Sequence, residues 1–140
     1  MHRLTYFQKP VPRALLVLLT CLLAGPVQAE WVALGRTDSL RVYLDPKPVQ
    51  KSADSVQIWQ LMDFVTAQWV DAQTVVGSIK NLVEYDCQQR RFRTLTAEAY
   101  SEQMGDGRKV ANERPANPPW EAIEPGSSAE KMRGIACGTR

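Results

Sequence analysis

Two of the three cysteines, Cys87 and Cys137, lie beyond the N-terminal apolar segment that contains Cys21, and their chemistry depends on the compartment the protein occupies. In an oxidising compartment, an even pair of cysteines is most simply a disulfide. A closed tetrahedral metal shell needs four ligands, and a redox-active pair has Cys-x-x-Cys spacing, which these two lack. We therefore predict a Cys87–Cys137 disulfide, provided that the chain is exported.

The first 29 residues have the composition of an export signal. A basic segment, residues 1–13, precedes an apolar run, residues 14–25, that is too short to span a bilayer. Small residues at the −3 and −1 positions then mark a cleavage site after Ala29. We predict a cleaved signal peptide, residues 1–29, and an exported domain, residues 30–140.

Lipidation at Cys21 is the alternative to simple cleavage. Thr20 is a poor residue before a lipidated cysteine, and the apolar run continues beyond Cys21. We therefore predict a protein that is not lipidated, located in the periplasm or associated with the outer membrane or cell surface.

Cleavage changes the chemistry available to the chain. It removes the only histidine and three of the 17 basic residues but none of the 15 acidic ones, so the net charge becomes −1. Histidine-dependent nucleophiles are then excluded, and no phosphate-binding glycine loop occurs. We predict no enzymatic activity, no cofactor, no metal site and no nucleic-acid partner. A hydrolase that uses the carboxylates Glu84 and Asp86 remains a minor alternative.

Arg90, Arg91 and Arg93 form the one notable charged cluster of the exported domain. They could bind a sulfated glycan, a phosphate-bearing lipid or an acidic protein. The alternative is a solvated strand face on which Glu84 and Asp86 neutralise them. Both interpretations stay open, and the cluster is a candidate binding site.

Trp69 is a second candidate contact. Most of the four tryptophans should lie in the core, because aromatic side chains bury large areas in a small domain. Trp69 precedes Asp71 and Gln73 in a segment typical of a loop, so we expect it to be the most exposed. It would contact a partner or anchor the loop.

Strands must position most of these residues. Alternating apolar residues predict strands over 31–34, 40–45 and 77–87, with a further strand over 97–104. Residues 56–70 fit a helical stripe and a strand equally well, so periodicity alone does not decide this segment.

A hairpin joins the 77–87 strand to the arginine cluster. If Gln88 and Gln89 form a tight turn, charges lie opposite charges and rings opposite rings. The expected cross-strand pairs are Asp86 with Arg91, Glu84 with Arg93, and Tyr85 with Phe92. Cys87 should then point toward the core.

A helix should follow the proline-rich segment 114–119. Ser127 and Glu130 have the spacing of a capping box, and Gly138 is available as a C-cap. We expect this helix to carry Met132, Ile135 and Ala136 inward. The predicted disulfide would then tie it to the strand that ends at Cys87.

The order of these motifs resembles the surface-adhesin protein E family of Gram-negative bacteria, over nearly all of the exported domain. The most specific part is the Glu-Tyr-Asp-Cys strand joined to a Pro-Gly-Ser helix that ends in cysteine. The other matching segments are Ile58-Trp59-Gln60-Leu61-Met62-Asp63-Phe64, Ser78-Ile79-Lys80, Arg90-Arg91-Phe92-Arg93, Tyr100-Ser101 and Met104-Gly105.

The resemblance implies an α+β fold: a curved antiparallel β-sheet of about six strands packed by a C-terminal α-helix, with the disulfide tying the two together. It also favours a strand for residues 56–64. The family's characterised adhesin engages host matrix and plasma proteins, binds haem and can dimerise. Haem would find no histidine ligand in the exported domain, so a tyrosine or methionine would be needed.

We therefore predict an exported, non-enzymatic binding module that engages a host extracellular-matrix or plasma protein and can form a homodimer. The alternative is a periplasmic envelope structural or stress protein that has no host partner.

Overall fold

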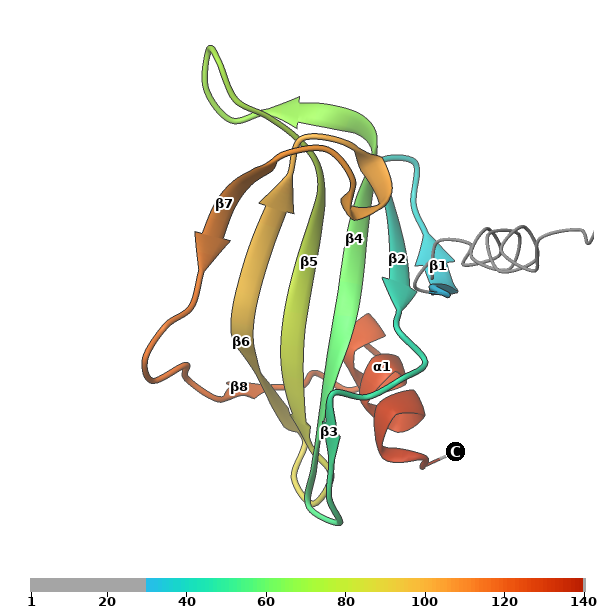
Figure 1. Cartoon of the computed structure of the whole chain (residues 1–140). Helices are drawn as coiled ribbons and strands as arrows, with labels where there is room; N and C mark the ends of the chain where they lie inside the picture. Colours follow the sequence, from blue (N-terminus) through green and yellow to red (C-terminus); the bar gives the residue numbers. More distant parts are fainter. Residues whose placement is uncertain (1–29, 140) are drawn as a thin grey trace, which may run out of the picture.

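The computed structural model describes residues 30–139 (Figure 1). Six strands form one antiparallel sheet in the order β1-β2-β4-β5-β6-β7, and two short strands, β3 and β8, pair with β4 and β6. The predicted signal peptide lies outside the described residues. The elements are β1 (Val32–Arg36), β2 (Leu40–Leu44), β3 (Gln50–Lys51), β4 (Ser55–Trp69), β5 (Val75–Asp86), β6 (Arg91–Tyr100), the 3₁₀ turn η2 (Gln103–Gly105), β7 (Lys109–Glu113), β8 (Glu121–Ala122) and α1 (Ser128–Cys137).

The segment that periodicity left undecided is the long central strand β4. It pairs with β2 along one edge and with β5 along the other, so its backbone groups are satisfied by neighbouring strands. Val56 and Ile58 are buried on one face, while Leu61 and Asp63 are buried on the other. Strand structure, which the family resemblance favoured, is confirmed.

The β5–β6 hairpin has the predicted register. Asp86 lies opposite Arg91, and Tyr85 lies opposite Phe92. The connection is a four-residue loop, Cys87–Arg90, instead of a two-residue turn. Oδ1 of Asp86 accepts hydrogen bonds from the backbone N–H groups of Gln88 and Gln89, at 2.8 and 2.9 Å. This Asx-type cap explains why two glutamines are tolerated there.

The predicted separate strand over residues 97–104 is wrong. Residues 91–100 form one continuous strand, β6, in which Leu95 is the extra residue of a β-bulge. The bulge shifts the apolar alternation by one residue, which is why the sequence suggested two strands. Residues 103–105 form η2, and the following β7 was not predicted, because it carries few apolar residues and is held by pairing with β6.

Helix α1 begins and ends as expected. Oγ of Ser127 accepts the N–H of Glu130, and Gly138 adopts the left-handed conformation that terminates the helix. Ala136 is buried and Met132 packs on the core, but Ile135 is 48% exposed. Its expected inward position is therefore wrong, because the short helix presents only one narrow face to the sheet.

The core lies between α1 and one half of one sheet face. In Figure 1 the helix lies behind the lower part of the sheet, near the β5–β6 hairpin. The buried cluster is completed by Ile123 from the segment that leads into the helix. Its other members are Leu44, Val56, Ile58, Val83, Tyr85 and Ala136.

Three contacts fasten α1 to the β5–β6 hairpin. The predicted Cys87–Cys137 disulfide is present and closes a separation of 50 residues. The guanidinium of Arg133 donates to the backbone oxygens of Asp86 and Cys87 at 2.7 and 2.8 Å. Arg90 forms an ion pair with Glu130 at 3.3 Å.

Replacing Cys87 and Cys137 by serine together should lower the free energy of unfolding by about 4 kcal/mol, the loop-closure value for a loop of this length. Urea unfolding with and without a reducing agent measures the change. Reduced wild type should match the double variant, and an unchanged unfolding midpoint would contradict a stabilising disulfide.

Tyr85 should make the protein sensitive to alkali. Burial raises the pKa of Tyr85 to about 12, although the hydrogen bond from Gln60 opposes this rise. An unfolded tyrosine ionises near pH 10. As pH rises, the tyrosine at position 85 therefore ionises in the unfolded state before it ionises in the folded state, which stabilises the unfolded state. The free energy of unfolding should fall as pH rises from about 10 to 12.

Denaturant unfolding over this pH range, with the ultraviolet absorbance of tyrosinate, checks that expectation. Tyr85→Phe should remove the phenol with a pKa of about 12 and leave Tyr100, whose pKa burial also raises, whereas Tyr43→Phe should leave both phenols in place. A wild type whose phenols all ionise at their ordinary pKa would contradict the effect of burial.

Candidate functional site

The tip of the β4–β5 hairpin presents the two most exposed of the large apolar side chains in residues 30–139. Trp69, the last residue of β4, is 71% exposed, and Val70 beside it is 62% exposed. The predicted exposure of Trp69 is thus confirmed, although it ends a strand instead of lying within the loop. In Figure 1 this hairpin extends beyond the upper edge of the sheet.

The turn beneath Trp69 is well ordered by its own hydrogen bonds. Oδ1 of Asp71 accepts the backbone N–H groups of Gln73 and Thr74, each at 2.8 Å, and Val70 donates to the carbonyl of Thr74 at 3.0 Å. The hydrogen bond from Gln73 lowers the pKa of Asp71, with a further contribution from Thr74. The turn is therefore fixed while the carboxylate is ionised.

The three candidate arginines lie together at the opposite end of the sheet, and each is paired with an acid. Arg93 contacts Glu84 at 2.6 Å and Arg91 contacts Asp86 at 2.8 Å, as the predicted register requires. Arg90 instead reaches Glu130 on α1, a pairing that the sequence did not suggest.

Trp120 completes this surface. The guanidinium carbons of Arg91 and Arg93 lie 4.5 and 4.4 Å from the centre of its ring, so the indole covers both cations. Burial raises the pKa of Asp86, but hydrogen bonds from the loop N–H groups and from Arg91 outweigh it and hold that pKa below its usual value. The three arginines and the acids that pair with them therefore form a largely neutralised surface, on which Arg90 is the most exposed cation.

The structure does not bring Trp69 and the arginines together. Trp69 lies opposite Val75 at one end of β5, and Arg91 lies opposite Asp86 at the other. At the rise of a β-strand, this separation is about 35 Å. A single small ligand therefore cannot contact both, whereas an extended protein surface can.

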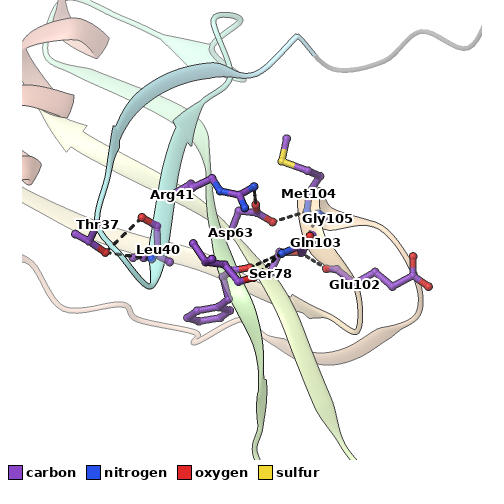
Figure 2. Close-up of polar contacts among 11 residues, drawn as sticks. Thr37, Leu40, Arg41, Asp63, Ser78, Glu102, Gln103, Met104 and Gly105 are labelled. Atoms are coloured by element: carbon purple, nitrogen blue, oxygen red, sulfur yellow. Dashed lines mark hydrogen bonds and ion pairs between the residues drawn. The ribbon is translucent and has the colours of Figure 1, made fainter.

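A third polar cluster, absent from the predictions, surrounds Asp63 (Figure 2). This carboxylate is fully buried. Its Oδ1 accepts the backbone N–H of Met104 at 2.6 Å, and its Oδ2 accepts from Arg41 at 3.2 Å. The charge and the hydrogen-bonding capacity of the Asp63 carboxylate are therefore both satisfied within the protein.

Ser78 and Gln103 extend this cluster to the neighbouring strands. The hydroxyl of Ser78 donates to the carbonyl of Glu102 at 2.6 Å and accepts the N–H of Gly105 at 2.8 Å. The amide of Gln103 donates to the carbonyl of Phe64 at 2.7 Å. These bonds attach η2 to the sheet where β4 ceases to follow the register of β5.

The backbone of this region is tightly constrained. Met104 has a φ of 59°, which costs free energy for a residue with a side chain. Gly77 permits the close approach of η2, because a Cβ there would lie 2.6 Å from the carbonyl oxygen of Glu102. The Asp63 cluster therefore has a structural role, because it holds η2 against β4 and β5. One carboxylate within the apolar run 58–65 was the sequence signal for it.

Residues 30–139 contain neither a cluster of metal-binding side chains nor a candidate membrane-spanning helix. No group of three or more histidine, cysteine, aspartate or glutamate side chains there could hold a metal ion. Within the same residues, no helix has the length and apolarity needed to cross a membrane.

Comparison with known proteins identifies the fold just described. A sequence model of surface-adhesin protein E matches residues 31–138. The chain belongs to the surface-adhesin protein E family. The resemblance inferred from the motifs is therefore confirmed, and membership in a surface-adhesin family implies export to the cell surface. No curated protein sequence matches the chain.

Solved structures of protein E have the same fold. A structure of Haemophilus influenzae protein E aligns with a TM-score of 0.59 and 13% identity, covering 80% of this chain and 86% of that chain. A structure from non-typeable Haemophilus influenzae aligns with a TM-score of 0.57 and 14% identity, covering 83% and 82%. At such identities the likeness is one of fold, so the family's binding residues cannot be transferred by position.

Replacing Asp63 by alanine should destabilise the protein by about 3 kcal/mol, because it leaves the Met104 N–H and the Arg41 guanidinium without their acceptor. Asp63→Asn should cost less, since the amide oxygen can still accept from Met104. Urea unfolding and amide hydrogen exchange at Met104 and Gly105 measure the effect.

The matched control is Asp106→Ala, an exposed carboxylate beside the same turn. It should leave both stability and exchange unchanged. If Asp63→Ala behaves like this control, the hydrogen bonds of Asp63 do not hold η2 against the sheet.

Proposed function

We propose that this family member is an exported, non-enzymatic binding module that engages a host extracellular-matrix or plasma protein. The observation that supports this most directly is the 71% exposure of Trp69 on an ordered hairpin tip. Tryptophan is enriched among residues that dominate binding energies. A turn fixed by Asp71 also loses little conformational entropy when it binds.

The arginine surface is the second contact in this proposal. Arg91 and Arg93 are paired with acids and lie against the ring of Trp120, so this part of the surface is partly neutralised. Arg90 has a side chain that is 57% exposed and is the cation best able to meet an acidic partner. Charges of this kind influence association rate and orientation more than affinity.

Residues 1–29 are, in this proposal, a cleaved signal peptide, and residues 30–140 form the exported domain. The protein is not lipidated, because the Cys21 region lacks a suitable preceding residue. It is associated with the outer membrane or cell surface, where a host protein can contact it. The edge strands β1 and β7 can pair with a second copy of the chain to form a homodimer.

The alternative function is a periplasmic envelope structural or stress protein without a host partner. It is supported by the pairing of all three candidate arginines with acids of the same chain, which accounts for these residues without a ligand. Location on the cell distinguishes the two functions.

Trp69→Ala should weaken binding to immobilised basement-membrane extract or plasma protein by about 30-fold, the effect of losing a binding hot spot of about 2 kcal/mol. Surface plasmon resonance with residues 30–140 measures this. Val49→Ala is the matched control, because Val49 is also exposed but lies beside the opposite end of β4. Arg90→Ala should mainly reduce the association rate.

Equal binding by Trp69→Ala and wild type would remove the hairpin tip from the proposal. Treating intact cells with an external protease tests location independently of the partner. Digestion of the protein is expected for a surface adhesin, and resistance in intact cells with digestion in lysed cells would favour the periplasmic alternative.

A further inference from the structure

The helix covers only part of the sheet face on which it packs. On β2, Leu44 belongs to the buried core cluster, whereas Val42 lies two residues away on the same face and outside that cluster. Val42 lies opposite Met62, which lies opposite Ile79. This second apolar row is half-buried.

A cavity opens where this row meets the helix. It lies between the β1–β2 hairpin and α1 and has a volume of about 210 Å³. Its apolar wall includes Leu34, the unpaired residue of the β1 bulge, which also packs on the core. The lining residues are Leu34, Gly35, Arg36, Thr37, Leu40, Val42, Ser128, Lys131 and Met132.

The charged side chains that line this cavity are all basic. Lys131 and Arg36 are among the lining residues, and none of the lining residues is acidic. The ammonium of Lys131 donates to the carbonyl of Leu34 at 3.2 Å, which leaves two of its three donors for another acceptor. Glu130, the neighbouring acid on α1, pairs with Arg90 instead.

We infer that this cavity binds an amphiphile with a short unbranched alkyl chain and an anionic head group, as in a medium-chain carboxylate. The chain lies against Leu34, Leu40, Val42 and Met132, and the carboxylate meets Lys131 at the rim. This site is distinct from the hairpin tip and from the arginine surface, and it does not depend on adhesion.

The size of the cavity selects this class of ligand. Pockets for drug-sized ligands have volumes of roughly 300–1,000 Å³, so a large planar ring system does not fit. At about 30 Å³ for each water-sized group, the cavity holds roughly seven groups of a chain. A longer chain can continue over the half-buried Val42 row.

Octanoate is the probe, and 1-octanol is its neutral counterpart of equal chain length. Titration of isotope-labelled protein, followed by amide NMR shifts, should show saturable binding of octanoate with a dissociation constant on the order of 1 mM. The amides of Gly35, Val42 and Lys131 should move most. Octanol should bind more weakly.

Gly35→Leu tests the location. Gly35 lies opposite Val42, and a Cβ there meets no atom within 4 Å, so leucine fills the cavity without a clash. It should abolish the shifts of the lining residues. Ala33→Leu is the matched control, because Ala33 is exposed and points to the other sheet face. If Gly35→Leu lowers the melting temperature, Val42→Phe fills the same space.

Lys131→Gln tests the head group. It should weaken octanoate binding about threefold, the effect of one partly exposed ion pair, and leave octanol binding unchanged. Lys47→Gln, an exposed lysine that does not line the cavity, should change neither. Absence of saturable octanoate binding, equal losses for Gly35→Leu and Ala33→Leu, or an unchanged octanoate affinity in Lys131→Gln would each overturn the inference.

Discussion

The attachment of α1 to the β5–β6 hairpin is the constraint on which the rest of the structure depends. A ten-residue helix with one narrow apolar face has little intrinsic stability. The bond between Cys87 and Cys137 keeps it against the sheet, and Arg133 fixes its orientation by binding the backbone of the hairpin. The helix in turn buries the central strands, so the covalent link determines where the core can form.

Because the helix is fastened at one end of the sheet, the other end has to be organised differently. There Asp63, Ser78 and η2 replace a hydrophobic core with buried hydrogen bonds. The β4–β5 hairpin beyond them extends past the edge of the sheet (Figure 1), and Trp69 at the end of β4 is exposed there. The disulfide-linked helix and the exposed tryptophan thus lie at opposite ends of the same strands, which suits a family of adhesins.

The features predictable from the sequence were those encoded locally. The register of Asp86 with Arg91 followed from alternation and charge, and the start of α1 followed from the Ser127 cap. β7 and η2 could not be predicted, because they depend on partners far along the chain: Asp63 and Met104 are 41 residues apart. At the candidate site, the exposure of Trp69 was predictable from its neighbours, whereas the Arg90–Glu130 pair required the helix to be placed first.

The course of β5 has a mechanical consequence. This strand runs from the hairpin tip directly to the loop that contains Cys87. Tension applied at Trp69 in the direction of the strands is therefore transmitted through the covalent backbone of β5 to the disulfide and the helix. The hydrogen bonds of the sheet lie perpendicular to this direction, so they are sheared together instead of opening one after another.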